Sequence, residues 1–387
     1  MDTQPLYDLS PVLTLMGVGL LGALGPLAWI WLRNKNAAPT RRLQALTLLT
    51  LFLTFDLVLF GAFTRLTDSG LGCPDWPGCY GSATPVGARA EISAAQEALP
   101  SGPVTHKKAW IEMIHRYMAT GVGVLILTLT VASWLASRHR QGGVPVNPWL
   151  PTFTLVWVCV QGAFGALTVT MKLFPAIVTL HLLGGLVLLM LLCAQAVRLS
   201  HAQDERMPTP IGSTTRALLV GGFALLWLQI ALGGWVSTNY AVLACTDFPT
   251  CHGKWWPYMD FSQGFEIWRQ LGKTGEGENI GFAALTAIHY THRLSAYLVF
   301  AVLGVLVWRM RRVPALRRQS AWLAGLLALQ FLTGLSNVVL GWPLIAAVLH
   351  TGGAAALVIV LTWAVCESRL AVDTLSASRL RASSLSA

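Results

Sequence analysis

The sequence predicts an all-α integral membrane protein with two pseudo-symmetric four-helix transmembrane bundles and one extra transmembrane helix at the N-terminus. Its 387 residues are 54% hydrophobic and only 11% charged, whereas a soluble domain carries about 25% charged residues. Nine apolar runs are long enough to cross a bilayer as helices. Eight of them form two blocks that repeat His, Gly, Gln and Cys residues in the same order. This order indicates a parallel repeat about an axis near the membrane normal.

The predicted spans follow one another along the whole chain. They cover residues 12–32, 43–64, 114–136, 150–171, 176–198, 216–238, 284–308, 321–341 and 344–366. The first is not a secretory signal, because an acidic stretch precedes it and basic residues follow it, the reverse of a signal's order. We therefore expect four parts. These are residues 1–42 with the extra helix and a cytoplasmic loop, 43–200 with the first half, 215–370 with the second half, and 371–387 as a cytoplasmic tail.

The basic residues gather in alternate short loops, which places those loops and the C-terminal tail in the cytoplasm. They are Arg33, Lys35, Arg41, Arg42, Arg138, Arg140, Arg198, Arg206, Arg216, Arg309, Arg311, Arg312, Arg317, Arg318, Arg369, Arg379 and Arg381. The N-terminus and two long loops, residues 65–113 and 239–283, then face the periplasm of a bacterial inner membrane. Because this pattern accounts for the net charge of +10, we expect no nucleic-acid partner.

The seven cysteines are of two kinds. Three lie within predicted spans, where free Cys behaves as a small hydrophobe: Cys159, Cys193 and Cys366. The other four form two close pairs in the long loops, Cys73 with Cys79 and Cys245 with Cys251. An oxidising exterior favours a disulfide within each pair. Zinc is the competing interpretation, although Cys-x5-Cys is not a usual zinc-finger spacing.

The repeat is visible in motifs as well as in spans. The loop motif Cys-x-Asp-aromatic-Pro-x-Cys occurs at residues 73–79 and again at 245–251, and after each loop comes a span that contains His-Arg. The equivalent residues are Gly61 and Gly233, His115-Arg116 and His292-Arg293, Gln161 and Gln330, Gly165 and Gly334, His181 and His350, and the glycine pairs Gly184/Gly185 and Gly352/Gly353. Agreement at this many offsets is not expected by chance.

Four histidines occupy equivalent places near the outer ends of their spans: His115 and His181 in the first half, His292 and His350 in the second. An ionisable residue inside a span is costly and points to function. A single such His is explained equally well by an interhelical hydrogen bond, but four favour paired axial ligands of haem iron. The sequence therefore predicts one haem site in each half. The haem propionates could then pair with arginines that equally well reach lipid headgroups, namely Arg65, Arg116 and Arg293.

The two halves differ in their acidic residues. Glu112 lies one helical turn before His115, and its counterpart in the second half is His289. A carboxylate there could transfer protons or stabilise a cationic intermediate; the alternative is an interfacial carboxylate paired with Lys107 or Lys108. The asymmetry suggests that one half performs chemistry while the other stores or transfers electrons. Asp56, in the middle of a span, is either part of a proton path or, as we favour, a buried partner of a Ser, Thr or Arg.

In the order of these motifs the chain resembles the haem A synthase family of cytochrome oxidase assembly, over about residues 43–370. The motifs are Glu112-Met-Ile-His115-Arg116, Thr291-His292-Arg293, Leu180-His181, Leu349-His350-Thr-Gly-Gly353, and Thr64-Arg65-Leu66-Thr67 leading into Gly70-Leu71-Gly72-Cys73. The family has eight spanning helices in two four-helix halves and oxidises a ring methyl of haem O to a formyl group, giving haem A. The extra span at 12–32 lies outside this pattern.

The resemblance implies a role for each candidate residue. His115 and His181 would flank the substrate haem O, with Glu112 as the essential carboxylate, and His292 and His350 would ligate a haem b cofactor. The cysteine pairs match those in the loops of some family members, which implies a redox role rather than a purely structural one for at least the first pair, Cys73 and Cys79. The implied partners are haem O, the farnesyltransferase that produces it, and an electron donor or acceptor in the membrane; a homo-oligomer is left open.

Two other functions remain open from the sequence. A bis-histidine di-haem electron carrier predicts haem b in both halves and no modified haem. A haem transporter or chaperone predicts loosely held haem, with the cysteine loops as gates. An ion transporter fits less well, because the histidines lie near one membrane face rather than at the midplane.

Overall fold

The computed structural model describes residues 10–139 and 147–371, a part of the chain that is almost entirely helical. Its long helices are α1 (Ser10–Asn34), α2 (Pro39–Leu66), α4 (His106–His139), α5 (Trp149–Thr170), α6 (Pro175–Gln203), α7 (Ser213–Thr238), α9 (Phe282–Met310), α10 (Arg317–Val339) and α11 (Leu344–Cys366). Each contains a segment long and apolar enough to cross a membrane. The predicted all-α, multi-pass class is therefore confirmed. The predicted cytoplasmic tail, with Arg379 and Arg381, lies outside the described residues, as does Arg140.

The short elements lie in the connections. Three of them belong to the two long loops, α3 (Arg89–Ala98), η1 (Ala241–Leu243) and α8 (Phe261–Gly264), and η2 (Pro314–Leu316) precedes α10. Strand β1 (Thr209–Ile211) pairs in parallel with β2 (Ser368–Leu370) and so ties the segment after α6 to the segment after α11. The sequence predicts no strand here, because three residues are too few to show the two-residue alternation of a strand.

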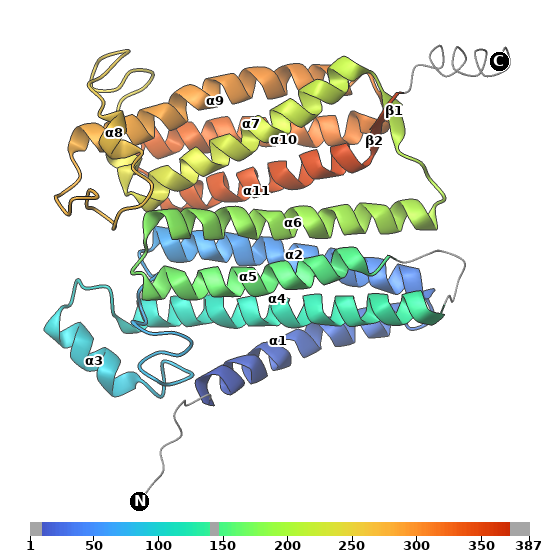
Figure 1. Ribbon diagram of the computed structural model, residues 1–387, viewed down its shortest axis with the longest axis horizontal. Helices are drawn as coiled ribbons and strands as arrows, with labels where there is room; N and C mark the ends of the chain where they lie inside the picture. The colour runs from blue at the N-terminus through green and yellow to red at the C-terminus, as the bar shows by residue number, and fades with distance from the viewer. Residues whose placement is uncertain (1–9, 140–146, 372–387) are drawn as a thin grey trace, which may run out of the picture.

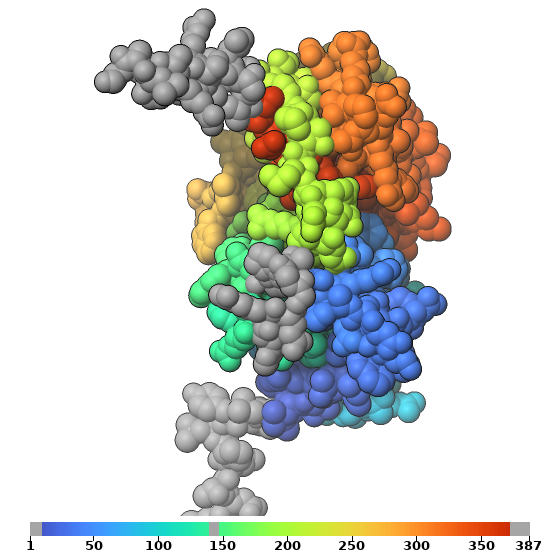
Figure 2. All heavy atoms as spheres, turned by 90° about the vertical axis from the view of Figure 1, so that its right-hand side faces the viewer, coloured from blue at the N-terminus to red at the C-terminus, as the bar shows by residue number. Residues whose placement is uncertain are grey.

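The long helices run side by side along the long axis of the molecule (Figure 1). The two long loops, marked by α3 and α8, lie at one end of the helices, and β1 and β2 lie at the other. The end view in Figure 2 looks onto the strand end, where red residues of β2 lie against the lime segment that contains β1. The N-terminal ends of four helices therefore lie close to the long loops: α4, α6, α9 and α11.

Helix contacts recur between the two halves of the chain. In the first half α2 packs against α4 and α6, and α5 packs against the same two helices. In the second half α7 packs against α9 and α11, and α10 packs against those two. Contacts of α6 with α7 and α11, and of α2 with α11, join the halves. The description of the halves as pseudo-symmetric bundles stays a prediction from the repeat.

The largest hydrophobic core lies where α6 meets the helices of the second half. Its fully buried side chains include Leu189 on α6, Leu303 and Leu306 on α9, and Leu361 on α11. Inside a bilayer such contacts stabilise through close packing rather than through removal of water. The core therefore lies mainly within the second half, and α6 of the first half packs against it.

Helix α1 packs along α4 and α2 on the side of the first half that faces away from the second half (Figure 1). Gly19 allows a close approach: a Cβ atom added there would lie 2.4 Å from Cγ2 of Thr120 on α4. Near its N-terminus Leu15 joins a buried cluster with Cys73, Cys79 and Met113. The helix thus covers the first cysteine loop as well as the flank of α4.

Candidate functional site

The four candidate histidines lie on four different helices and form two pairs. His115 is on α4 and His181 on α6, while His292 is on α9 and His350 on α11. All four imidazoles are half-buried. His115 lies within electrostatic range of His181, and His292 lies within range of His350. The structure therefore brings together the partners that the repeat pairs.

Each imidazole packs against a glycine on a neighbouring helix. A Cβ atom added at Gly61 on α2 would lie 3.0 Å from Nε2 of His115, and one added at Gly233 on α7 would lie 2.9 Å from Cε1 of His292. For His181 and His350 the glycines are Gly165 on α5 and Gly334 on α10, with distances to Cε1 of 3.5 and 3.2 Å. A missing side chain lets a ring lie directly on the facing backbone. The glycines noted in the sequence repeat are thus the surfaces that support the four rings.

We expect Gly233→Ala to displace His292 and to release at least nine-tenths of any haem held by the second half. Alanine is the better helix former by about 1 kcal/mol, so a loss would come from the clash with the imidazole and not from helix propensity. Gly221→Ala on the same helix is the matched control, because a Cβ atom there meets no other atom within 4 Å. Soret absorbance per purified protein measures the difference, and equal absorbance of the two variants would contradict the prediction.

Haem iron fits these paired imidazoles. The described residues contain no group of three or more His, Cys, Asp or Glu that could hold a bare metal ion, whereas haem brings four of its own nitrogen ligands and needs only two from protein. Nδ1 of His350 lies 3.0 Å from the Thr333 hydroxyl, which leaves Nε2 for the iron. Nδ1 of His181 is buried without a hydrogen-bond partner in the described part of the chain. Two imidazoles on separate helices of a bundle are a common way to hold haem.

Glu112 is buried on α4, with an exposed fraction of 4%. Its Oε2 accepts a hydrogen bond of 2.8 Å from the backbone N–H of Cys73, and its Oε1 pairs with the guanidinium of Arg116 one turn further along the helix. The alternative partner Lys108 pairs instead with Asp68, at 3.1 Å. Glu112 therefore connects the helix that carries His115 to the first cysteine loop.

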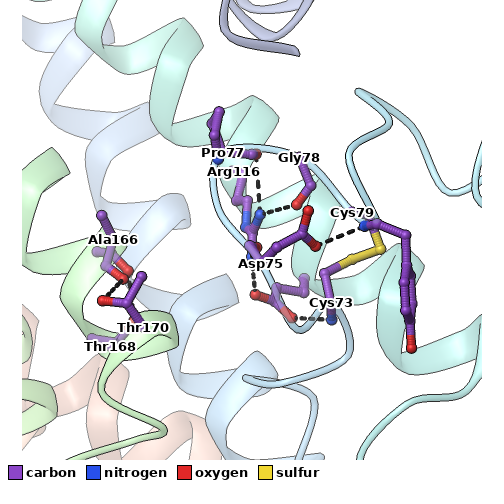
Figure 3. A network of polar contacts seen from close by, with 12 residues as sticks. Cys73, Asp75, Pro77, Gly78, Cys79, Arg116, Ala166, Thr168 and Thr170 are labelled. Carbon is purple, nitrogen blue, oxygen red and sulfur yellow. Dashed lines mark hydrogen bonds and ion pairs between the residues drawn. A yellow bond between two sulfur atoms is a disulfide. The ribbon is translucent and has the colours of Figure 1, made fainter. Parts of the chain in front are cut away.

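Arg116 holds the first cysteine loop from inside. Its guanidinium donates to the carbonyls of Asp75, Pro77 and Gly78 at 3.1, 3.1 and 2.6 Å, as Figure 3 shows. The disulfide Cys73–Cys79 closes this loop. The sequence predicts that Arg116 pairs with a haem propionate or reaches a lipid headgroup. In the structure its guanidinium bonds instead to the loop carbonyls and to Glu112. The separation of about 40 residues between these partners left no local sequence signal.

The second cysteine loop is held in the same way. Arg293 donates to the carbonyls of Asp247 and Thr250 within the loop that the Cys245–Cys251 disulfide closes. The Asp247 carboxylate accepts from the Thr250 hydroxyl and from the amides of Gly253 and His252, and these bonds hold the pKa of Asp247 at about 2. Asp75 accepts from two loop amides in the first half. The Asp of the repeated motif, Asp75 in the first loop and Asp247 in the second, thus fixes the loop backbone. The sequence shows the repeated Asp but does not predict this role.

His289, the counterpart of Glu112, is buried on α9. Its Nδ1 lies 2.9 Å from the carbonyl of Ala241 in η1. The two equivalent positions thus both contact the loop at their end of the helix, but only the first half places a carboxylate there.

A polar cluster joins the two halves at the loop end. Arg65 at the end of α2 donates to the carbonyl of Ser237 at 2.6 Å and lies 4.0 Å from the ring centre of Tyr240. The Tyr240 hydroxyl donates to Asp68 at 2.6 Å, and Lys108 pairs with the same carboxylate. Arg65 therefore bridges α2 to the loop after α7.

Two expectations about isolated residues need correction. Asp56 on α2 is half-buried and forms no hydrogen bond to any residue that the structure describes, so the favoured buried partner is absent. The sequence also predicts that His201 lies in a solvated loop; in the structure it lies within α6 and bonds to Glu367 at 2.9 Å. Both errors concern contacts between helices, which a single helix's pattern does not reveal.

Comparison with known proteins adds a family to this geometry. The model of the cytochrome oxidase assembly protein family, COX15-CtaA, matches residues 44–362. The chain belongs to this family. The match begins after α1, which therefore lies outside it, in agreement with the sequence analysis.

Relatives in the family are similar over most of their length. A haem A synthase of Shewanella oneidensis is 40% identical over 313 residues, which cover 81% of this chain and 92% of that protein. A haem A synthase of Halalkalibacterium halodurans is 27% identical over 306 residues, with coverage of 76% and 86%. A third, of Rhizobium meliloti, is 27% identical over 356 residues, with coverage of 86% and 91%. The family likeness thus spans the helices from α2 to α11.

Proposed function

We propose that the chain is a haem A synthase, an oxidoreductase that converts haem O into haem A. Membership of the cytochrome oxidase assembly family and the names of its relatives support this activity. The single observation that carries it is the unequal repeat: two pairs of imidazoles on glycine supports, with a buried carboxylate beside only the first pair. A carrier with two equal haem sites has no need of that difference.

The first half is then the catalytic half. His115 and His181 would hold the substrate haem O from its two faces, as the glycine supports on α2 and α5 allow. Oxidation of the ring methyl to a formyl group takes the carbon through an alcohol, in two two-electron steps. With water as the oxygen source, the electrons pass to the proposed electron acceptor in the membrane and protons are released. Glu112 is placed to take up those protons, because it lies one turn from His115 and its oxygens are fixed by Cys73 and Arg116.

The second half would hold haem b between His292 and His350. Bound there, haem b supplies a one-electron redox centre. The chain's own contribution is to bury and orient the haem. The two imidazole rings lie on Gly233 and Gly334, and the position equivalent to Glu112 is His289 and not a carboxylate. The residue ranges 43–200 and 215–370 describe these two functional halves, with α1 and the tail outside them.

The orientation in a bacterial inner membrane follows from the charges. The short loops at the strand end carry the basic residues, so we place that end in the cytoplasm and both cysteine loops in the periplasm. The disulfides Cys73–Cys79 and Cys245–Cys251 suit an oxidising compartment. The farnesyltransferase that makes haem O, an electron partner in the membrane and a second copy of the chain are the proposed partners.

Expression of the chain in cells that make haem O but no haem A tests the function. The haems are extracted from the membranes and identified by mass. Appearance of haem A, dependent on the chain, supports the synthase. Unchanged haem O together with haem b in both halves would instead identify a di-haem electron carrier, and haem that is lost on detergent extraction would identify a transporter or chaperone.

A further inference from the structure

The two halves hold their imidazoles differently. In the second half, polar side chains of neighbouring helices reach Nδ1 of both rings: Gln229 on α7 lies 3.0 Å from Nδ1 of His292, and Thr333 on α10 lies 3.0 Å from Nδ1 of His350. In the first half no described residue hydrogen-bonds the ring of His115, and Nδ1 of His181 is buried without a partner. The two halves therefore differ in the hydrogen bonds at Nδ1, the ring nitrogen that would face away from an iron bound at Nε2.

The repeat shows why the first half has no such partners. Gln229 lies four residues before Gly233, and the residue four before Gly61 is Leu57. Thr333 directly precedes Gly334, whereas Phe164 directly precedes Gly165. Both polar positions are therefore apolar in the first half, where Leu57 and Phe164 pack into hydrophobic clusters instead.

A third contact follows the same division. Gln330 on α10 donates to the carbonyl of His350 at 2.8 Å. Its counterpart Gln161 occupies the equivalent place against Gly184, yet its Oε1 is buried without a hydrogen-bond partner among the described residues. Both halves thus have a glutamine at this position, but only the glutamine of the second half, Gln330, bonds to the helix that carries the histidine.

The hydroxyl of Thr333 also determines the tautomer of His350. It donates its own proton to the carbonyl of Leu329 at 2.8 Å, so toward His350 it can only accept. The proton of the imidazole then lies on Nδ1, and the lone pair of Nε2 is free for iron. Hydrogen bonding of the distal ring nitrogen fixes the orientation of a metal-bound His and raises its basicity.

Gln229 plays the same part less strongly. A His292 that ligates iron through Nε2 carries its proton on Nδ1, so the amide must present Oε1, its buried and unpartnered oxygen. That rotation gives up the bond of 3.1 Å from Nε2 of Gln229 to the carbonyl of His292. The gain at Nδ1 is therefore partly offset, and we expect a smaller effect than at Thr333.

We propose that Thr333 and Gln229 are positioning residues that make the second half a site of permanent haem retention, while Leu57 and Phe164 leave the first-half imidazoles unanchored so that haem can exchange there. This inference rests on the proposed division into a substrate half and a cofactor half. A substrate must leave after each turnover, so a site without ligand anchors suits it, whereas a resident redox group requires fixed ligands.

The test uses full-length protein purified in detergent from cells without haem O, with haem b as the only haem. Thr333→Val removes the hydroxyl at nearly constant volume, Thr333→Ser keeps it, and Gln229→Leu copies the first half. Thr362→Val is the matched control: Thr362 is buried on α11 and bonds only to its own helix, at Val358. The midpoint reduction potential and the rate of haem transfer to apomyoglobin are measured for each protein.

We expect Thr333→Val to accelerate haem transfer from the second half by about 10- to 100-fold, the usual effect of losing such a ligand partner. A less basic His350 favours ferrous iron, so the potential rises; a tenfold shift of the redox equilibrium is about 59 mV for one electron. Thr333→Ser and Thr362→Val should match the wild type, and Gln229→Leu should fall between. Wild-type rates and potentials in both Thr333→Val and Gln229→Leu would overturn the inference.

Failure of the proposed function would look different. In that case the wild-type protein itself would form no haem A from haem O, whatever Thr333 does to potential and retention. A wild type that forms haem A, with variants that hold haem b unchanged, would refute only the role of the ring anchors.

Discussion

His350→Ala protein is expected to be purified without the haem that the second half of the wild-type protein retains. The side chain is one of the two candidate iron ligands of this half, and removing a ligand should lower haem affinity by more than the roughly 100-fold that loss of an outer partner costs. His292→Ala should have the same effect, because the two rings form one proposed pair of ligands. Soret absorbance and pyridine haemochrome content per protein measure the loss.

His201→Ala is the control for this experiment. His201 is also a histidine of a long helix, but it bonds to Glu367 and belongs to neither pair. We expect it to keep full haem content. His115→Ala should keep the haem of the second half as well, because its ring lies in the first pair. Retention of wild-type pigment by both His292→Ala and His350→Ala would refute the assignment of the second site.

Glu112→Gln is expected to reduce the yield of haem A by about 10²- to 10⁴-fold, the usual contribution of a positioned acid or base. The amide can still accept the hydrogen bond from Cys73, but it can no longer take up a proton. Haem b in the second half should remain, and its unchanged Soret band shows that the protein is folded. Extracted haems are quantified by mass in cells supplied with haem O.

The loop contact of Glu112 requires a separate control. Glu112 connects α4 to the Cys73–Cys79 loop, so its loss could act through the loop and not through proton transfer. Asp75→Asn weakens the anchor of the same loop at Tyr80 and Gly81 without touching Glu112. We expect most activity to remain in Asp75→Asn; a decrease as large as that of Glu112→Gln would assign Glu112 a purely structural role.

These contacts suggest how the cysteine loops serve the haem sites. Each loop is tied by an Arg to the helix that carries a candidate ligand, one residue after His115 in the first half and after His292 in the second. Through its Cys73 amide the first loop also contacts Glu112, the candidate acid. In the first half the loop therefore contacts both the helix that carries His115 and the candidate acid, whereas in the second half His289 stands in place of that acid.

Much of the fold could be predicted from the sequence, because each membrane-spanning helix requires a long run of apolar residues. A run of about 20 apolar residues has no other stable form in lipid, so all the spans were predicted, including the extra N-terminal one. The helices extend beyond the apolar runs; α4 begins at His106 rather than near residue 114, because polar residues outside the bilayer can continue a helix. The repeat likewise identified His115, His181, His292 and His350 as two pairs of candidate ligands.

The partners of the polar side chains were decided by the tertiary structure alone. Arg116 bonds to loop carbonyls about 40 residues away, Thr333 and Gln229 reach rings on other helices, and Asp56 lacks the partner expected for it. Hydrophobic periodicity tells which residues are apolar, but not how two helices are rotated about their axes, and a rotation by one residue carries a side chain to another neighbour. The sequence thus determined which residues are the candidate haem ligands and that they occur in two sets. In the second half, helix packing decided which ring nitrogen is left free, because Nδ1 of His292 and of His350 each contacts a polar side chain of another helix.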